Sequence, residues 1–394
     1  MRTALLEDGR RLLEELLAEI PEPKVQPVPG QRIYTDRPCQ VLSIFGPVRL
    51  SRNYYYVAGQ NGTCPLDAAL GLLGGFTPGA ARMLSRTAAQ LPYEESSHQL
   101  RELAGLEVDP SQIQRLVQQA GNKAQLLLPL IEAVPVQAQQ QLYISVDGTG
   151  VPMSPDELEG RVGRGPDGTA RTREIKLAAL FTQTAVDEQG QPVRDESSTT
   201  YLTSFAPAQE FGLQVRQAAR SRSFGRAAQT VFIGDGAAWI WELARTCFPD
   251  ALQILDFYHA AEHVCSLAKA VYTEPAVANN WALCWKAHLY DGEVDEVLRQ
   301  ARAAAGDAVS EAVQRELDYL QRNHPRMNYG HYRAQGLFIG SGVVEAGCKR
   351  VIGQRLKQSG MFWCETGAAA IATLRAALLS AQTWDPLWDR LLAA

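Results

Sequence analysis

Two kinds of hydrophobic pattern alternate along the 394-residue chain, and each predicts a different kind of element. The start, MRTALLEDGRRLLEELLAEI, has apolar residues at helical spacing in an otherwise charged segment, which predicts an amphipathic helix. A Pro-rich connector comes next, and CQVLSIFGPVRLSRNYYYV then has two strand-like runs around the turn FGP. We therefore expect a β-hairpin near residues 39–57.

A helical pattern covers residue 66 to about residue 130. Within it, YEESSHQLRELAGLEVDPSQIQRLVQQAGNKA predicts a helix, a Gly-containing turn and a second helix that begins at Asp109-Pro110, because Asp is a good N-cap and Pro a good first helical residue. Such a pair is either a DNA-reading helix-turn-helix or a plain helical hairpin. In the first case, Gln114 and Arg115, with three further glutamines of the same helix, would face a groove.

From residue 141 the pattern changes to strands. LYISVDGTGV, REIKLAALFTQTAV and STTYLTSFA predict three strands, whereas TVFIGDGAAWIWELARTCF and ALQILDFYHAAEHVCSLAKAVY each predict a strand followed by a helix. Alternation of strand and helix requires parallel crossovers, so the order predicts a mixed α/β sheet. This order matches the RNase H-like fold. Later segments look helical, and GSGVVEAGCKRVIGQRLKQSG supplies a further helix after a Gly-rich entry.

The expected fold class is α/β: an RNase H-like mixed sheet with an all-helical insertion, preceded by a mainly helical N-terminal domain with a small β-hairpin. Five parts are expected along the chain. They are a helix and hairpin (1–65), a helical domain (66–135), the first part of the sheet-containing core (140–265), the insertion (266–335) and the C-terminal helices of the core (336–394).

Composition is that of an ordinary globular protein, with 46% hydrophobic and 21% charged residues. The net charge of −5 shows no basic excess, so any DNA binding must come from local patches. The acidic start is not a signal peptide, and no apolar run approaches the roughly 18 residues of a spanning helix. Seven cysteines without a C-x-x-C pair argue against a disulfide framework. We expect a cytoplasmic protein with no membrane partner.

Three acidic residues lie where chemistry is expected. Asp147 closes the first strand of the α/β part, and Asp235 closes a strand expected beside it, where functional residues of open sheets collect. Glu345 lies early in a late helix, after GSG. Three converging carboxylates can hold two divalent ions, Mg²⁺ or Mn²⁺, for phosphodiester chemistry. Each acid alone is more typical of a turn or a helix cap, so the prediction depends on all three together.

The stretch LDFYHAAEH contains H-x-x-E-H, from His259 to His263, which spells an inverted zinc-peptidase helix. The preceding run ALQIL, however, predicts a buried strand that ends at Asp256. His259 would then lie in the first turn of a helix rather than in its middle. A zinc peptidase would also leave the two aspartates unexplained and would need a downstream acid as its third ligand.

Several of these segments together resemble the DDE transposases of bacterial insertion sequences, most closely the Kra-type group. The resemblance extends from about residue 142 to residue 365, in YISVDGTGVPM, REIKLAALF, VFIGDGAAWIWELARTCFP, ILDFYHAAEHV and GSGVVEAGCKRVIGQRLKQSGMFW. It implies an RNase H-like catalytic core in which Asp147, Asp235 and Glu345 hold two Mg²⁺ or Mn²⁺ ions. The long gap between the second and third acids fits an all-helical insertion.

The same resemblance gives H-x-x-E-H a different meaning. Related transposases place a C/D-x-x-H motif after the second acid, and Asp256-Phe257-Tyr258-His259 matches it. Asp256 and His259 would then be catalytic residues, with His259 bordering the active site and orienting the scissile phosphate or Asp256. His263 would face the helical insertion as an ordinary, partly buried residue. Members of the group often carry paired cysteines around YYYVAGQNGTCPLD, but this chain has only Cys64 there, so a zinc-binding front module is not expected.

The activity that the resemblance implies is DNA transposition. A metal-activated water would nick the element end, and the freed 3′ hydroxyl would attack target DNA. The partners would be the terminal inverted repeats and target DNA, and joining two ends implies a homodimer or a larger oligomer. A domesticated descendant that binds DNA without cutting it stays open as the alternative.

Basic residues flank the predicted acids, and phosphate neutralisation supplies much of the affinity for DNA. One group lies in the loop RVGRGPDGTARTR and the other in the helix after Glu345, although solvated charge explains either group alone. The residues are Arg161, Arg164, Arg171, Arg173, Lys349, Arg350, Arg355 and Lys357. Trp239, shortly after the second aspartate, either stacks on an unpaired base or anchors the core.

Overall fold

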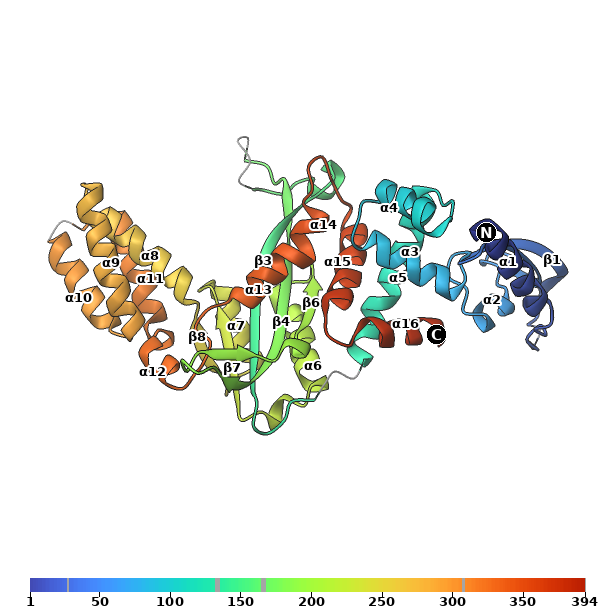
Figure 1. Cartoon of the computed structure of the whole chain (residues 1–394). Coiled ribbons are helices and arrows are strands. Elements are labelled where there is room, and N and C mark those ends of the chain that lie inside the picture. Colours follow the sequence, from blue (N-terminus) through green and yellow to red (C-terminus); the bar gives the residue numbers. More distant parts are fainter. Residues whose placement is uncertain (27, 132–134, 164–167, 307–308, 394) are drawn as a thin grey trace. The chain divides into compact units, whose positions relative to one another are not determined.

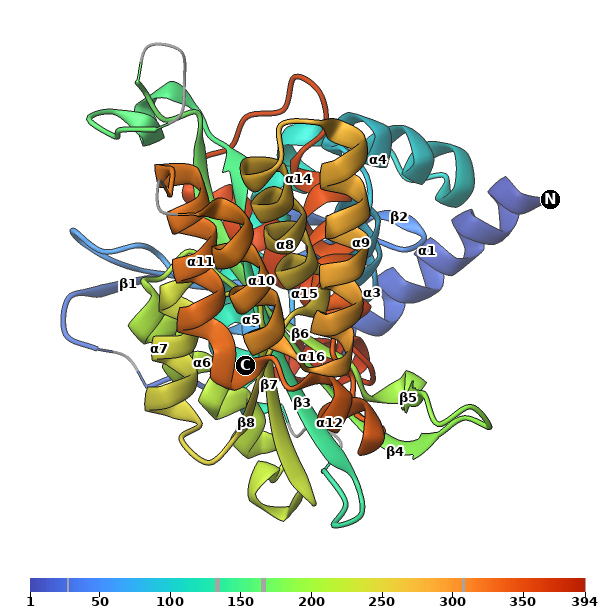
Figure 2. The ribbon, with the colours of Figure 1, turned by 90° about the vertical axis from the view of Figure 1, so that its left-hand side faces the viewer.

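The computed structural model describes residues 1–26, 28–131, 135–163, 168–306 and 309–393. These residues form two compact units (Figures 1 and 2), each described by itself. The first unit consists of Met1–Ile131, Val151–Thr172 and Val351–Ala394, and the second of Glu132–Gly150 and Arg173–Arg350. None of the described helices is long and apolar enough to cross a membrane.

The first unit begins with the predicted helix and hairpin. Helix α1 (Arg2–Ala18) precedes β1 (Gln31–Ser43) and β2 (Gly46–Val57), which pair in antiparallel orientation. The hairpin starts earlier than predicted, because its first pair joins Gln31 to Val57. The upstream half of β1 is exposed, so it lacks the apolar alternation by which a strand is recognised in sequence.

Helices make up the rest of the first unit. They are α2 (Pro65–Ala69), α3 (Pro78–Ala88), α4 (Tyr93–Gln99) with a π-helical continuation (Leu100–Ala104), α5 (Pro110–Leu127), α14 (Gln354–Leu356), α15 (Glu365–Leu379) and α16 (Trp384–Ala393). The predicted start of α5 is confirmed: Asp109 accepts a hydrogen bond from Ser111 N at 2.8 Å, and the side chain of Gln112 completes a capping box. Helices α5 and α15 pack closely, since a Cβ at Gly121 would lie 2.5 Å from Ala370.

The predicted C-terminal domain, residues 336–394, is divided between the two units. The segment up to Arg350 belongs to the second unit, whereas α15 packs against α5 in the first. This division could not be predicted from sequence, because the boundary lies inside one continuous helical segment: α13 (Gly342–Gly347), a π-helical turn (Cys348–Gly353) and α14 follow one another directly.

The second unit contains a mixed sheet, as predicted, and this sheet has six strands. Its strands are β3 (Gln141–Pro152), β4 (Thr172–Val186), β5 (Pro192–Arg194), β6 (Thr200–Ser204), β7 (Gln229–Gly234) and β8 (Leu252–Leu255). The order is β5-β4-β3-β7-β8, with β6 also paired to β4. Strand β7 is parallel to both β3 and β8, and β4 is antiparallel to β5 and β6. The three-residue β5 was not predicted, because it is too short to show a pattern.

Helices cover both faces of this sheet and extend beyond it. Helix α6 (Ala208–Ser221), α7 (Ala238–Cys247) and α8 (Phe257–Val271) were predicted, and the helical region after them contains α9 (Pro275–Asp291), α10 (Val294–Ala305), α11 (Glu311–Asn323) and α12 (Tyr329–Ala334). Helices α8, α9 and α11 lie side by side (Figure 2). Short 3₁₀ turns occupy Leu128–Leu130, Pro155–Leu158, Glu196–Ser198, Phe224–Arg226 and His324–Arg326.

Strand β4 shows which helix covers which face. Gly347 at the end of α13 lies against Leu177, whereas the neighbouring Lys176 places its ammonium 5.7 Å from the ring centroid of Trp239 in α7. Successive side chains of a strand point to opposite faces. Helices α13 and α7 therefore lie on opposite faces of the sheet, and α13 crosses the strands in Figure 1.

Candidate active site

The two predicted aspartates occupy equivalent positions relative to two neighbouring parallel strands, Asp147 within β3 and Asp235 directly after β7. The ladder between β3 and β7 ends at the pair Ser145–Ile233, and Asp147 and Asp235 each lie two residues further along their strand direction. Because β3 and β7 run parallel, both aspartates lie at the same edge of the sheet. The prediction that Asp147 ends its strand is wrong, because β3 continues to Pro152.

Burial gives Asp147 an unusual environment for a carboxylate. Desolvation is the main cause that raises its pKa above the ordinary value, and Asp235 adds to it. Hydrogen bonds act in the opposite direction: Gly148 N donates to Oδ1 at 2.6 Å, and the Cys348 thiol donates to Oδ2 at 3.3 Å. The charge of His259 also lowers this pKa. The net pKa is raised, so the site favours a proton or a bound cation at Asp147.

This raised pKa leads to a stability prediction. An aspartate with a raised folded-state pKa stabilises the fold only while protonated, so that contribution is present below the unfolded pKa, about 3.9, and is lost as pH rises through the folded pKa. We therefore expect Asp147→Asn to raise the Tm at pH 7 without divalent ions, and the gain to vanish below about pH 4. The exposed Asp318→Asn is the control, and an Asp147→Asn variant with a lower Tm at pH 7 would contradict the assignment.

A tight loop after β7 holds Asp235. Its Oδ1 accepts a hydrogen bond from Ala237 N at 2.9 Å, and its carbonyl oxygen accepts one from the Tyr319 hydroxyl at 2.9 Å. Gly236 has φ +98°, and a Cβ there would lie 2.4 Å from that hydroxyl oxygen. Burial, with the charge of Asp235, raises the pKa of Tyr319, so the tyrosine stays a neutral donor. Helix α11 of the insertion thereby contacts the loop of the second aspartate.

Glu345 lies in the short helix α13, one turn before Cys348. Its Oε1 accepts a hydrogen bond from Ser341 Oγ at 3.1 Å, and Cys348 is the residue that reaches Asp147. Throughout the described part of the chain, no three His, Cys, Asp or Glu residues are grouped closely enough to hold a metal ion. The donor chemistry of the paired aspartates fits a hard divalent cation. Glu345 therefore does not complete a three-ligand group with this pair.

Asp256 has a structural role, which corrects the prediction that it is catalytic. It is fully buried and caps α8: Oδ1 accepts a hydrogen bond from His259 N at 2.8 Å, and Oδ2 accepts one from Ser341 N. Both oxygens thus accept hydrogen bonds from backbone amides at the point where β8 gives way to α8. It is the amide of His259, rather than its ring, that contacts Asp256.

The two histidines of H-x-x-E-H have separate partners. His263 Nδ1 lies 2.5 Å from Oε2 of the buried Glu316 in α11, and its ring stacks on Tyr319 with centroids 3.5 Å apart. His259 Nδ1 lies 3.7 Å from the Glu262 carboxylate. His263 therefore contacts the helical insertion as expected, and the geometry gives no support to a zinc-peptidase site.

Most of the predicted DNA-binding basic residues are exposed. Within the first unit these are Arg161, Arg171 and Lys357, and within the second Lys349 and Arg350. Arg173 is half-buried, with its guanidinium 5.7 Å from the ring centroid of Phe205. Arg164 lies outside the described residues. Contact of these residues with DNA stays a prediction.

Arg355 is the exception, and its prediction as a phosphate contact is wrong. It is 0% exposed, its Nε donates a hydrogen bond to Ala88 O at 3.0 Å, and its guanidinium lies between 5 and 6 Å from the ring centroids of Tyr93 (5.2 Å) and Trp363 (5.1 Å). The carbonyl at the end of α3 and the two aromatic rings hold the side chain inside the first unit, where a DNA backbone cannot reach it.

Gln114 and Arg115 are exposed on α5, while the apolar stripe of that helix is buried. They stay candidates for DNA contact. Trp239 is half-buried: its ring packs against Phe211, with centroids 6.4 Å apart, and faces Lys176. This environment supports the core-anchor interpretation of Trp239 over base stacking.

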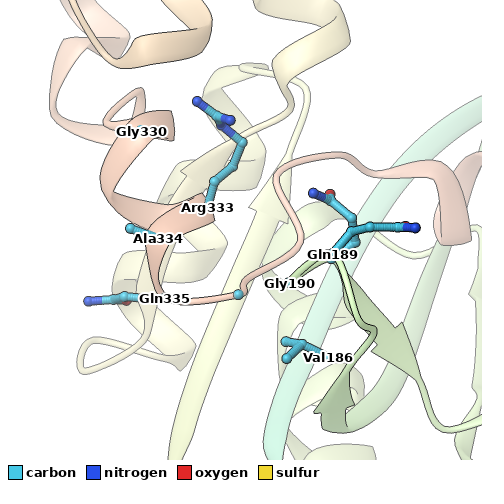
Figure 3. Close-up of a pocket in the computed structure, with 9 residues that line it drawn as sticks. Val186, Gln189, Gly190, Gly330, Arg333, Ala334 and Gln335 are labelled. Atoms are coloured by element: carbon cyan, nitrogen blue, oxygen red, sulfur yellow. The ribbon is translucent and has the colours of Figure 1, made fainter.

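A hollow of about 500 Å³ lies elsewhere in the second unit, between the β4–β5 turn and α12 (Figure 3). Residues such as Gln189 line one side and Arg333 the other. The guanidinium of Arg333 lies 3.4 Å from the ring centroid of Tyr290 and donates a hydrogen bond to Asp291 at 3.2 Å. None of the predicted site residues lines this hollow, so it is separate from the acidic site.

Three residues beside the acids were missed in the sequence. Cys348 follows Glu345 at a spacing of three residues, which places both on one face of a helix. Its position near the acids could therefore have been predicted from the sequence. Ser341 lies in the Gly-rich entry GSG, which was noted for its glycines alone. Tyr319 had no sequence signal, because it reaches Asp235 from a helix of the insertion.

Comparisons with known proteins leave the family of the chain open. No protein-family model matches the sequence, and no curated protein matches it. Among solved structures, one that matches is described as the Drosophila P element transposase strand transfer complex, with a TM-score of 0.28 and 8% sequence identity over 79% of this chain and 80% of that chain. A similarity at this level assigns neither family nor activity.

Proposed function

We propose that this protein is a DDE transposase of the bacterial insertion-sequence type, built on an RNase H-like core. One observation carries the proposal: Asp147 and Asp235 lie at equivalent positions of adjacent parallel strands, and the helix of Glu345 packs beside them through Cys348. The strand order β6-β4-β3-β7-β8 and the helices inserted before α13 support the same core. The sequence motifs that resemble these transposases contain all three acids.

The three carboxylates would hold Mg²⁺ or Mn²⁺. When bound, such ions activate the attacking oxygen and stabilise the leaving oxygen of a phosphodiester. The chain itself supplies the ligands, and the hydrogen bonds from Gly148 and Cys348 orient Asp147. The exposed arginines and lysines of each unit would neutralise phosphates, and α5 would read the element ends through Gln114 and Arg115. Two ends must be joined, so we propose a dimer or larger assembly on DNA.

A non-cleaving, domesticated DNA-binding protein is the second candidate. The observation in its favour is that Glu345 does not complete a three-ligand group with the aspartates among the described residues. The two candidates differ in catalysis alone, because both require specific binding to DNA.

A nicking assay separates the candidates. Wild-type protein is incubated with DNA that carries the repeats flanking its gene, with Mg²⁺, Mn²⁺ or a chelator, and with a scrambled-repeat duplex as control. The transposase proposal expects metal-dependent cleavage at the repeat boundary of the true sequence alone. Specific binding without cleavage would indicate the domesticated protein, and absence of specific binding would contradict both candidates.

A further inference from the structure

We infer that Asp256 and Ser341 together position Glu345, an inference that rests on the proposed role of Glu345 as the third acid. Neither residue touches the reacting atoms in this assignment. Asp256 holds the backbone at the entry to α13, and Ser341 holds the Glu345 carboxylate itself.

Asp256 connects the strand of the second acid to the helix of the third. Its backbone N donates a hydrogen bond to the carbonyl of Gly234, the residue before Asp235, at 2.8 Å. Its carboxylate accepts hydrogen bonds from His259 N and from Ser341 N. An ordinary helix cap needs the first of these carboxylate contacts alone. The second joins α8 to a segment more than 80 residues later in the chain, since Asp256 and Ser341 are 85 positions apart.

The neighbouring backbone supports this connection. Phe257 N donates a hydrogen bond to Ile339 O at 2.9 Å, so the entry to α13 is held at two adjacent points. A Cβ at Gly340 would lie 3.0 Å from the ring of Tyr258, so this segment passes close to the first turn of α8. The entry to α13 is thus fixed against the start of α8.

Ser341 carries the connection to the acid. While its amide is held by Asp256, its hydroxyl donates to Glu345 Oε1 at 3.1 Å. The residue is 4% exposed, so water competes little for either contact. Partners that orient a ligand in this way typically contribute 10- to 100-fold, approximately, to metal affinity or activity.

Hydrogen exchange tests the contact between the Asp256 carboxylate and the Ser341 amide, and it does not require the protein to be active. In full-length Asp256→Ser, serine can still cap α8 but is too short to reach Ser341. We expect the Ser341 amide, followed in overlapping peptides, to exchange at least about tenfold faster than in wild type. Asp109→Ser, the same change at the cap of α5, is the matched control and leaves that amide unchanged. Equal exchange in Asp256→Ser and wild type would overturn the inference.

Ser341→Ala tests the contact between the Ser341 hydroxyl and Glu345, because it removes the hydroxyl and keeps the backbone amide. We expect it to weaken Mn²⁺ binding, measured by electron paramagnetic resonance of the free ion, and the nicking rate by about 10- to 100-fold each. Ser341→Thr, which retains the hydroxyl, is expected to recover most of both. In a Glu345→Gln background, Ser341→Ala is expected to weaken Mn²⁺ binding no further, because the charged ligand that Ser341 orients is already lost. An equal loss in both backgrounds, or no recovery with threonine, would contradict the role of Ser341.

The readouts distinguish this inference from the proposed function. If wild-type protein neither binds Mn²⁺ nor nicks DNA, the transposase proposal fails, and with it the claim that Ser341 acts for catalysis. If wild type is active but Ser341→Ala matches it in metal binding and rate, the proposed function stands and the positioning role is wrong.

Discussion

Asp235→Asn is expected to lower metal-dependent nicking by on the order of 1,000-fold, while specific binding to the same DNA stays within about twofold of wild type. The asparagine keeps the acceptor for Ala237 N, so the loop that Tyr319 contacts is preserved and the charge alone is lost. The measurement is a single-turnover nicking rate beside a binding titration at fixed salt.

The control for this experiment is Asp318→Asn, the same change at an exposed aspartate of α11 whose contact is a hydrogen bond from Gln314. It is expected to retain the wild-type rate. Glu345→Gln is expected to behave like Asp235→Asn. If Asp235→Asn is inactive but Glu345→Gln is fully active, the third ligand has been assigned to the wrong residue.

Arg355→Ala is expected to destabilise the protein by about 3 kcal/mol, because it leaves a cavity between two aromatic rings and a buried carbonyl without its donor. The affected groups are Tyr93, Trp363 and Ala88 O, all in the first unit. Denaturant unfolding measures the loss. Where DNA binding can be measured below the Tm, its salt dependence is expected to match that of wild type.

Lys357→Ala, two positions further along the same segment, is the matched comparison, because this lysine is exposed. It is expected to leave stability within about 0.5 kcal/mol of wild type. If Lys357 contacts a phosphate, the slope of the logarithm of the binding constant against the logarithm of the salt concentration becomes shallower by about one in this variant. If Arg355→Ala is instead as stable as wild type, and its DNA binding depends less on salt, then Arg355 contacts DNA after all.

The helical insertion contributes directly to the surroundings of the acids. Tyr319 donates a hydrogen bond to the backbone of Asp235, and the same ring stacks on His263, which pairs with Glu316. This explains H-x-x-E-H without zinc: the backbone N of its first histidine donates to Asp256, the cap of α8, and its second histidine joins α8 to α11.

Sequence predicted the elements and their order well where the hydrophobic pattern was strong. The alternating strand–helix pattern after residue 200 gave β7, α7, β8 and α8, and Asp109-Pro110 marked the start of α5. It failed where no apolar pattern exists, as in the exposed upstream half of β1 and in the short β5. It also placed the end of β3 too early, because Asp147-Gly148 has the form of a turn although the strand continues through it.

The sequence by itself determined which acids are candidate metal ligands. Asp147, Asp235 and Glu345 each lie in a short motif, after a predicted strand or a Gly-rich helix entry, that can be recognised from neighbouring residues alone. Tertiary structure alone decided what surrounds them. Burial separates the enclosed Arg355 from the exposed Lys357, although these basic residues are only two positions apart. The contacts of Asp256 with Ser341 and of Tyr319 with Asp235 join residues far apart in the chain, and such pairings depend on packing that no local pattern encodes.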